Sequence, residues 1–122
     1  MSAPRIQLYH CADARSFRAL WALEELGLPY DLTLMPFPPR ARFEGYRDVN
    51  PLGTVPACLI DGQLMTESAA IPHVLATRFG PSSLALSPDE PDYPSYMNFL
   101  VMGEATLTFP QTIHLRYTRL EP

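Results

Sequence analysis

The pair Glu67 and Ser68 has residue types and a position that suit the binding of a zwitterion. Together with Thr66, the pair comes directly before residues 69–79, whose apolar side chains recur at helical spacing. The amides and the positive dipole end at a helix start favour an anion such as a carboxylate, which the Ser68 hydroxyl would assist. Glu67 would accept an ammonium group, so the pair suits the free end of an amino acid. Helix capping is the alternative interpretation, because Ser, Thr and Glu are common at helix starts for stability alone.

Val55 and Pro56 form a second candidate for ligand contact. Pro56 follows the turn-forming NPLG at 50–53 and precedes the apolar run ACLI at 57–60, which predicts a short buried strand. Cis peptide bonds before proline are uncommon and typical of tight turns. A cis bond here would turn the N–H and C=O of Val55 sideways from the sheet, where an extended peptide could pair with them. An ordinary trans turn is the alternative.

The cysteines and histidines limit the other chemistry that is open to the chain. Cys11 precedes the first predicted helix, but Ala14 stands where a second thiol would be needed. A dithiol exchange cycle is therefore excluded, and a monothiol reaction through a mixed disulfide is left. Cys58 falls in the apolar strand and is expected in the core. The dispersed histidines lack metal-ligand spacing, so no metal site is expected at His10, His73 or His114.

Apolar spacing and turn residues predict the elements that position these residues. A short strand at 6–9 is followed by a helix whose apolar residues run from Phe17 to Leu28 and which Gly27 and Pro29 close. A second strand is predicted at 30–34, followed by a helix-poor loop. Asp61-Gly62 predicts a hairpin between strands at 57–60 and 63–65, and Gly80-Pro81 ends the last helix. The order β-α-β, β-β-α specifies an α/β fold with a mixed sheet and helices packed on it.

Composition narrows the class of protein further. With 122 residues and 47% hydrophobic content, the chain can bury one modest core. Its net charge of −4 argues against a nucleic-acid surface. No apolar run approaches the roughly 20 residues of a membrane helix, and the first five residues lack the apolar core of a signal peptide. A reduced, cytoplasmic protein with no membrane partner is therefore expected.

Four segments carry a resemblance to a known family: IQLYH at 6–10, ARSFRALWALEELGLPY at 14–30, NPLGTVP at 50–56 and TESAA at 66–70. They resemble the N-terminal, thioredoxin-like domain of a cytosolic, bacterial-type glutathione transferase over about residues 5–80. The remainder resembles the first helices of the family's all-helical second domain. The resemblance implies a glutathione-binding domain at 1–84, a polar, proline-bearing linker at 85–92, and one or two helices of a truncated all-α domain at 93–122.

The resemblance also implies how glutathione would be held. The backbone of Val55, before the cis-proline Pro56 and after Thr54, would pair with the cysteinyl part of the tripeptide. Glu67 and Ser68 would hold its γ-glutamyl end. Arg40 or Arg42, in the proline-rich loop after residue 34, would meet the glycyl carboxylate through the fork that guanidinium and carboxylate form, although a solvated loop arginine is the alternative. Glutathione is then a co-substrate, and no other cofactor and no metal are expected.

Activation of the sulfur is where the resemblance departs from the family pattern. The family uses a Tyr, Ser or Cys near the end of the first strand or the start of the first helix, because a hydrogen bond to the thiolate lowers its pKa. Ala14 stands roughly where many relatives have Ser, and Arg15 where one bacterial class has Cys. The expected activators are therefore Ser16, through its hydroxyl at the helix start, and Arg15, through positive potential. Capping explains Ser16 as well, and Tyr9 is expected to bury its ring.

Three functions follow from these observations. The first is a glutathione transferase that conjugates the thiolate to a small electrophile, as in detoxification. The second is a non-catalytic module for dimerisation or protein interaction, and the third is a monothiol glutathione-dependent reductase that uses Cys11. The family's pocket for the electrophile needs more helices than the chain has after residue 93, and unpartnered apolar helix faces favour association, so a homodimer is expected.

Overall fold

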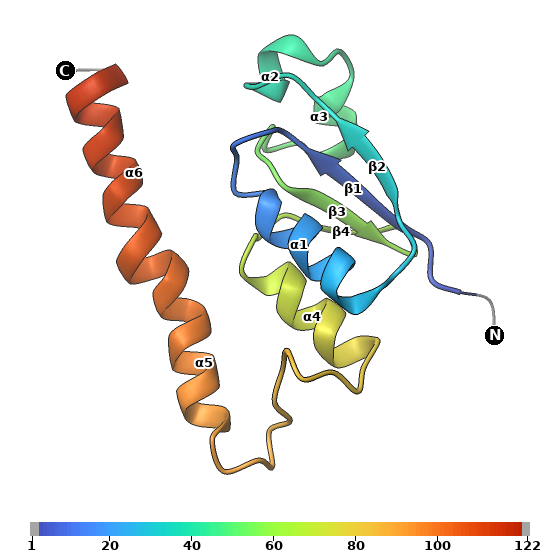
Figure 1. Cartoon of the computed structure of the whole chain (residues 1–122). Coiled ribbons are helices and arrows are strands. Elements are labelled where there is room, and N and C mark those ends of the chain that lie inside the picture. Colours follow the sequence, from blue (N-terminus) through green and yellow to red (C-terminus); the bar gives the residue numbers. More distant parts are fainter. Residues whose placement is uncertain (1–2, 121–122) are drawn as a thin grey trace. The chain divides into compact units, whose positions relative to one another are not determined.

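The computed structural model describes residues 3–120, which divide between two compact units with the boundary between Ser82 and Ser83. The first unit contains a four-stranded sheet with strands β1 (Ile6–His10), β2 (Asp31–Leu34), β3 (Ala57–Ile60) and β4 (Gln63–Met65). The strand order is β2-β1-β3-β4, with β1 parallel to β2, and β3 antiparallel to both β1 and β4. The predicted mixed sheet of thioredoxin-like topology is confirmed (Figure 1).

Two helices, α1 (Phe17–Leu26) and α4 (Ala70–Arg78), lie side by side over one face of this sheet (Figure 1). Their apolar faces and alternate residues of β1 and β3 form the main core, because successive strand side chains point to opposite faces. Cys58 lies in this core, as predicted. The buried side chains of this core are Ile6, Leu8, Ala19, Ala22, Leu23, Cys58, Ile60, Ile71 and Leu75.

Turn residues end the elements where the sequence predicted. Gly27 adopts the left-handed conformation at the end of α1, with a φ of 62°, and its N–H bonds to carbonyls of the last helical turn. Asp61 and Gly62 both have positive φ, 50° and 84°, as a two-residue type I′ hairpin turn requires. The hairpin of β3 and β4 is thus confirmed.

The segment between β2 and β3 differs from the helix-poor loop that the sequence predicted. It contains two short helices, α2 (Pro39–Arg42) and α3 (Tyr46–Val49). Pro39 begins α2, where its fixed φ is favourable and its missing N–H costs nothing. Tyr46 fills a second, smaller core with Cys11, Met35 and Ala57, which explains why so short a helix as α3 is held in place.

The second unit contains α5 (Tyr93–Met102), a π-helical segment η1 (Gly103–Thr108), α6 (Phe109–Leu115) and a second π-helical segment η2 (Arg116–Leu120). Pro110 lies in the first turn of α6, where its missing N–H is tolerated, and the wider η1 precedes it. None of the described side chains in 83–119 is buried. Within residues 3–120, no helix has the length and apolar character needed to cross a membrane.

Candidate functional site

The register of the sheet brings the predicted ligand residues to one edge. β1 ends at His10, opposite the end of β2, and Tyr9 pairs with Ala57 at the start of β3. Cys58 in turn pairs with Met65 at the end of β4. The loop after β1, Val55 and Pro56 before β3, and Thr66 to Ser68 after β4 therefore all leave the sheet at the same end.

Val55 and Pro56 lie immediately before β3, and the peptide bond between them is cis. Pro56 is fully buried, and Val55 is partly exposed. Strand β3 begins only at Ala57, so the backbone of Val55 lies outside the ladder that joins β3 to β1. The bonds Phe37–Pro38 and Gly80–Pro81 are also cis.

Two buried side chains fix the turn that leads to Val55. The Tyr46 hydroxyl donates to the Thr54 carbonyl at 2.6 Å, and the Asn50 amide donates to the same carbonyl at 2.8 Å. The Asn50 amide oxygen also accepts from the Leu52 amide at 3.1 Å. Buried polar groups without hydrogen-bond partners would destabilise the fold, but the Tyr46 hydroxyl and the Asn50 amide both have partners. The sequence placed Asn50 in a turn, but neither the hydrogen bonds of its side chain nor the role of Tyr46 was predicted.

Ser68 is buried and contacts a residue that sequence reasoning did not single out. Arg18, in the first turn of α1, donates through Nη1 to the Ser68 Oγ at 3.0 Å. The N-cap position of α4 is Ala69, and no side chain caps it. The capping interpretation of Ser68 is therefore wrong for its side chain. Glu67 is exposed beside it, and its carbonyl accepts from the amides of Ala70 and Ile71.

The sequence predicted that the Ser16 hydroxyl would reach the sulfur of the ligand. In the structure this hydroxyl points into the interior instead. Ser16 is fully buried, and its Oγ lies 2.7 Å from His10 Nδ1. The same oxygen accepts from the Cys11 amide at 3.2 Å and lies 3.3 Å from the Cys11 carbonyl oxygen. It makes no capping bond to α1. Ser16 thus ties the loop after β1 to its own helix, whereas Arg15 is exposed on that loop.

The two thiols lie in the interior. Cys11 is fully buried, with its Sγ 3.8 Å from the Pro36 carbonyl oxygen, and burial raises the pKa of its thiol. Burial also raises the pKa of Cys58 to about 11. Because the thiolate is the nucleophile, raised pKa values and lack of access both oppose thiol exchange. The structure therefore argues against the reductase interpretation based on Cys11. Among the described residues, no group of histidine, cysteine and carboxylate side chains could hold a metal ion.

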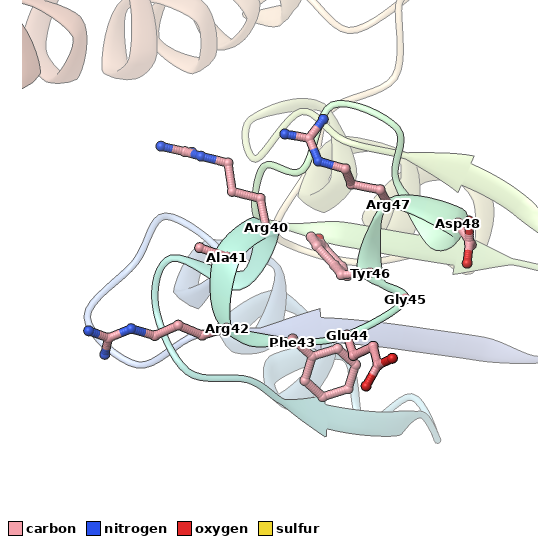
Figure 2. Close-up of a pocket in the computed structure, with 9 residues that line it drawn as sticks. All are labelled: Arg40, Ala41, Arg42, Phe43, Glu44, Gly45, Tyr46, Arg47 and Asp48. Atoms are coloured by element: carbon pink, nitrogen blue, oxygen red, sulfur yellow. The ribbon is translucent and has the colours of Figure 1, made fainter.

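The two arginines proposed for the glycyl carboxylate are placed differently. An open pocket of about 580 Å³ is lined by residues 40–48. Figure 2 shows Arg40 and Arg47 extending to one side of this segment and Arg42 extending elsewhere. A methyl group built on Gly53 would meet the Arg40 Cβ at 2.8 Å and the Arg47 Cζ at 3.7 Å. Arg40 and Arg47 therefore lie over the turn that precedes Thr54 and Val55.

Comparison with known proteins decides the family. A family model described as the N-terminal domain of glutathione S-transferase matches residues 14–78, which is more than half of the chain. The chain belongs to this glutathione S-transferase family. The match includes the loop from Ala14, the proline turn at 53–56 and the start of α4, so the matched segment contains the residues predicted to contact glutathione, whereas His10 and Cys11 lie before it.

Relatives of this glutathione S-transferase domain agree with that assignment. A curated protein, glutathione S-transferase 3 of Schizosaccharomyces pombe, is 33% identical over 102 residues, which are 84% of this chain and 42% of that protein. The chain thus spans less than half the length of this curated relative. A solved glutathione transferase from Methylococcus capsulatus is 25% identical, with a TM-score of 0.81 over 96% of this chain and 58% of its own. Glutathione transferase Omega 2S from Trametes versicolor is 29% identical, with a TM-score of 0.63 over 77% of this chain and 44% of its own.

Proposed function

We propose that this chain binds glutathione at the edge of the sheet where Val55, Glu67 and Ser68 meet, and that it presents the glutathione sulfur for conjugation to a small electrophile. One observation carries the proposal: the start of β3 and the end of β4 bring these residues to the same end of the sheet. The chain in which they meet belongs to the glutathione S-transferase family. Membership of the family and the placement of these residues at one end of the sheet both support this ligand.

Each part of the tripeptide has a suitable partner at this edge. The backbone of Val55, outside the strand ladder, would pair with the cysteinyl residue as an added strand does. Glu67 would accept the α-ammonium of the γ-glutamyl end, and Ser68 would donate to its α-carboxylate. Arg40, which packs over Gly53, would bind the glycyl carboxylate, and Thr54 lies between these contacts. Placement favours Arg40 over Arg42 for this role.

The chemical step requires the thiolate form of glutathione. The thiol proton leaves to solvent, the sulfur forms a bond with the electrophilic carbon, and a leaving group departs with its electron pair. Positive potential favours the thiolate, and exposed Arg15 together with the N-terminus of the ten-residue α1 would supply it. Ser16 is assigned a supporting role, because its hydroxyl is buried and already bonded within the loop.

A titration of the 122-residue chain with glutathione tests the proposal, followed through the amide chemical shifts of the isotope-labelled protein. Saturable shifts are expected at Val55, Glu67 and Ser68, and Glu67→Gln is expected to weaken binding about tenfold. Asp31→Asn is the matched control, because Asp31 is an exposed carboxylate at the opposite end of the sheet. A well-dispersed spectrum with no shifts would overturn the proposal.

The buried state of Ser16 favours a second function, a glutathione-binding module without conjugation. Ala14 offers no hydroxyl either, so neither of these two positions would give the sulfur the hydroxyl contact that the family usually makes. Ultraviolet absorbance of the thiolate separates the two functions. A thiol pKa of bound glutathione well below that of the free tripeptide supports conjugation, and an unchanged thiol pKa supports the binding module.

A further inference from the structure

Strand β2 forms one edge of the sheet, and within residues 3–120 no further strand pairs with its outer side. Backbone N–H and C=O groups of successive strand residues point to opposite sides of a strand. The Met35 N–H, directly after β2, donates to the His10 carbonyl of β1 at 2.8 Å. Counted back from Met35 in steps of two, Thr33 also faces β1. The backbone groups of Leu32 and Leu34 therefore face away from the sheet.

Leu32 and Leu34 leave their N–H and C=O groups open at this edge. Among the described residues, no backbone bond outside the ladder with β1 uses them. Their side chains lie on the face that the helices cover, since Leu32 is level with the buried Leu8, yet they are 46% and 64% exposed. Natural sheets often protect an edge with a lysine or a proline inside the strand, and DLTL at 31–34 has neither. This edge is therefore a template for an added strand.

The start of β2 carries negative charge. Asp31 is exposed there, and the Tyr30 hydroxyl donates to the Glu24 carboxylate of α1, which holds a second anionic group beside it. Arg5 is a cation at this end, where it lines an open pocket together with Tyr30 and Asp31. The carboxylates of Glu24 and Asp31 outnumber this guanidinium. An added strand with a basic side chain at this end would be complementary in charge.

A second copy of this chain would fit the edge less well. Two-fold pairing of β2 with itself would centre on Thr33 and set Asp31 opposite Met35, and the segment at 29–36 has no basic residue. Pro36 also has no N–H to donate. An edge of four residues is far smaller than the roughly 1,200–2,000 Å² that stable interfaces bury, so it suits a transient contact.

We propose that the β2 edge binds an extended peptide segment of another protein, antiparallel to β2. The segment would have apolar side chains opposite Leu32 and Leu34 and a lysine or arginine opposite Asp31. In such strand addition the main-chain hydrogen bonds give affinity, and alternate side chains give specificity. The inference goes beyond the proposed function and does not depend on glutathione, because β1 separates β2 from β3, before which Val55 lies.

A capped hexapeptide, threonine-valine-threonine-valine-lysine-threonine, is the probe. In antiparallel register its valines lie opposite Leu34 and Leu32, and its lysine lies opposite Asp31. The isotope-labelled 122-residue chain is titrated with this peptide and followed through amide chemical shifts and hydrogen exchange. We expect saturable shifts along β2 and slower exchange at the Leu32 and Leu34 amides. Exchange at Thr33 should not change, because its N–H already faces β1.

N-methylated peptides test whether backbone hydrogen bonds carry the contact. Methylation of both valine amides removes the donors that would face β2, and it should reduce affinity by about tenfold or more. Methylation of the threonine amide between them is the matched control. That amide would face solvent, so the affinity should change by less than about twofold.

Variants of the chain test the same bonds from the other side. Leu34→Pro removes an N–H that faces away from β1, so the ladder with β1 is kept and the peptide loses one bond, about fivefold to tenfold in affinity. Leu34→Val retains the N–H and should stay within about twofold. Asp31→Lys should weaken binding of the probe and strengthen binding of a peptide with glutamate in place of lysine. If Leu34→Pro does not fold, the two N-methylated peptides decide on the unmodified chain.

Slower exchange at Leu32 and Leu34, with loss of affinity only when the valine amides are methylated, is the supporting result. An absence of shifts along β2, or equal losses with both methylated peptides, would overturn the proposal. Slower exchange that appears as the chain alone is concentrated would assign the edge to a second copy and would also overturn it. Glutathione affinity should be equal in Leu34→Pro and the unmodified chain, so failure of either proposal leaves the other standing.

Discussion

The Ser16 hydroxyl lies 2.7 Å from the Nδ1 of His10, and both side chains are buried where β1 passes into α1. Mutation of a serine that faces a ligand changes the chemistry of that ligand. Mutation of a serine enclosed by a histidine and two backbone groups changes the stability of the fold instead. The distinction bears directly on which residues of this loop carry chemistry.

Ser16→Ala is expected to destabilise the fold without changing the thiol pKa of bound glutathione. Removal of Oγ leaves the Cys11 amide and His10 Nδ1 without their partner, which costs about 1–3 kcal/mol of unfolding free energy. Urea unfolding measures the stability, and thiolate absorbance measures the pKa. Ser83→Ala, at an exposed serine, is the control and should be neutral. A raised thiol pKa in Ser16→Ala would return Ser16 to the chemistry.

His10 is expected to make the stability depend on pH. Burial lowers the pKa of His10 below its ordinary value of 6.5. As the pH falls through 6.5, the unfolded chain takes up a proton before the folded chain does, so the stability falls until the pH reaches the folded-state pKa. Urea midpoints measured from about pH 7.5 to about pH 5 should therefore decrease. The decrease should be smaller in His10→Gln, and an equal decrease in both chains would contradict this account.

The thiols of Cys11 and Cys58 are expected to resist alkylation in the folded chain. Both are buried, and burial raises the pKa of each, that of Cys58 to about 11. Iodoacetamide at neutral pH should leave both unmodified, while the same treatment in denaturant should modify both, as mass spectrometry would show. Rapid modification of Cys11 in the folded chain would restore the reductase interpretation.

Arg40→Met and Arg42→Met form a matched pair on one short helix. Arg40 lies over Gly53, and Arg42 extends elsewhere (Figure 2). Arg40→Met is expected to weaken glutathione binding about fivefold to tenfold, and Arg42→Met is expected to have little effect. Glutathione whose glycyl carboxylate is converted to the amide should abolish the difference. Equal losses in both variants would indicate a general effect of positive charge.

Gly53→Ala should destabilise the chain more than Gly27→Ala does. Both glycines have left-handed backbone, with φ of 66° and 62°, so each alanine should cost about 1–2 kcal/mol. At Gly53 the new methyl group would also meet Arg40 Cβ at 2.8 Å, whereas at Gly27 nothing lies within 4 Å. The difference between the two unfolding free energies, from urea denaturation, measures that contact. Equal losses of unfolding free energy in the two variants would show that the turn at Gly53 moves to accommodate the new methyl group.

The sequence predicted most of the fold because its signals there are local. Gly27 closes a helix, Asp61-Gly62 closes a hairpin, and the apolar spacing of α1 and α4 specifies buried faces. The positions of Val55 and Ser68 were also predictable, since each follows from a turn or an element boundary. The short helices α2 and α3 were missed, because Tyr46 holds α3 through burial against distant residues.

The parts of the site that sequence reasoning missed depend on contacts between distant segments. The bond from Arg18 to Ser68 spans 50 positions, and no periodicity reveals it. Ser16 was assigned by its place at a helix start, which says nothing of the direction in which its hydroxyl points. Only the packing of His10 beside it shows that the hydroxyl faces inward.

The Thr54 carbonyl, held by Tyr46 and Asn50, has a consequence for the energetics of binding. The segment proposed to pair with a tripeptide is already held in one conformation when the chain folds, so the entropy of ordering it is lost during folding and not during association. A rigid binding segment of this kind would accept few alternative conformations of the ligand's backbone. Discrimination among ligands at Val55 then comes from how well their main chain matches a fixed edge.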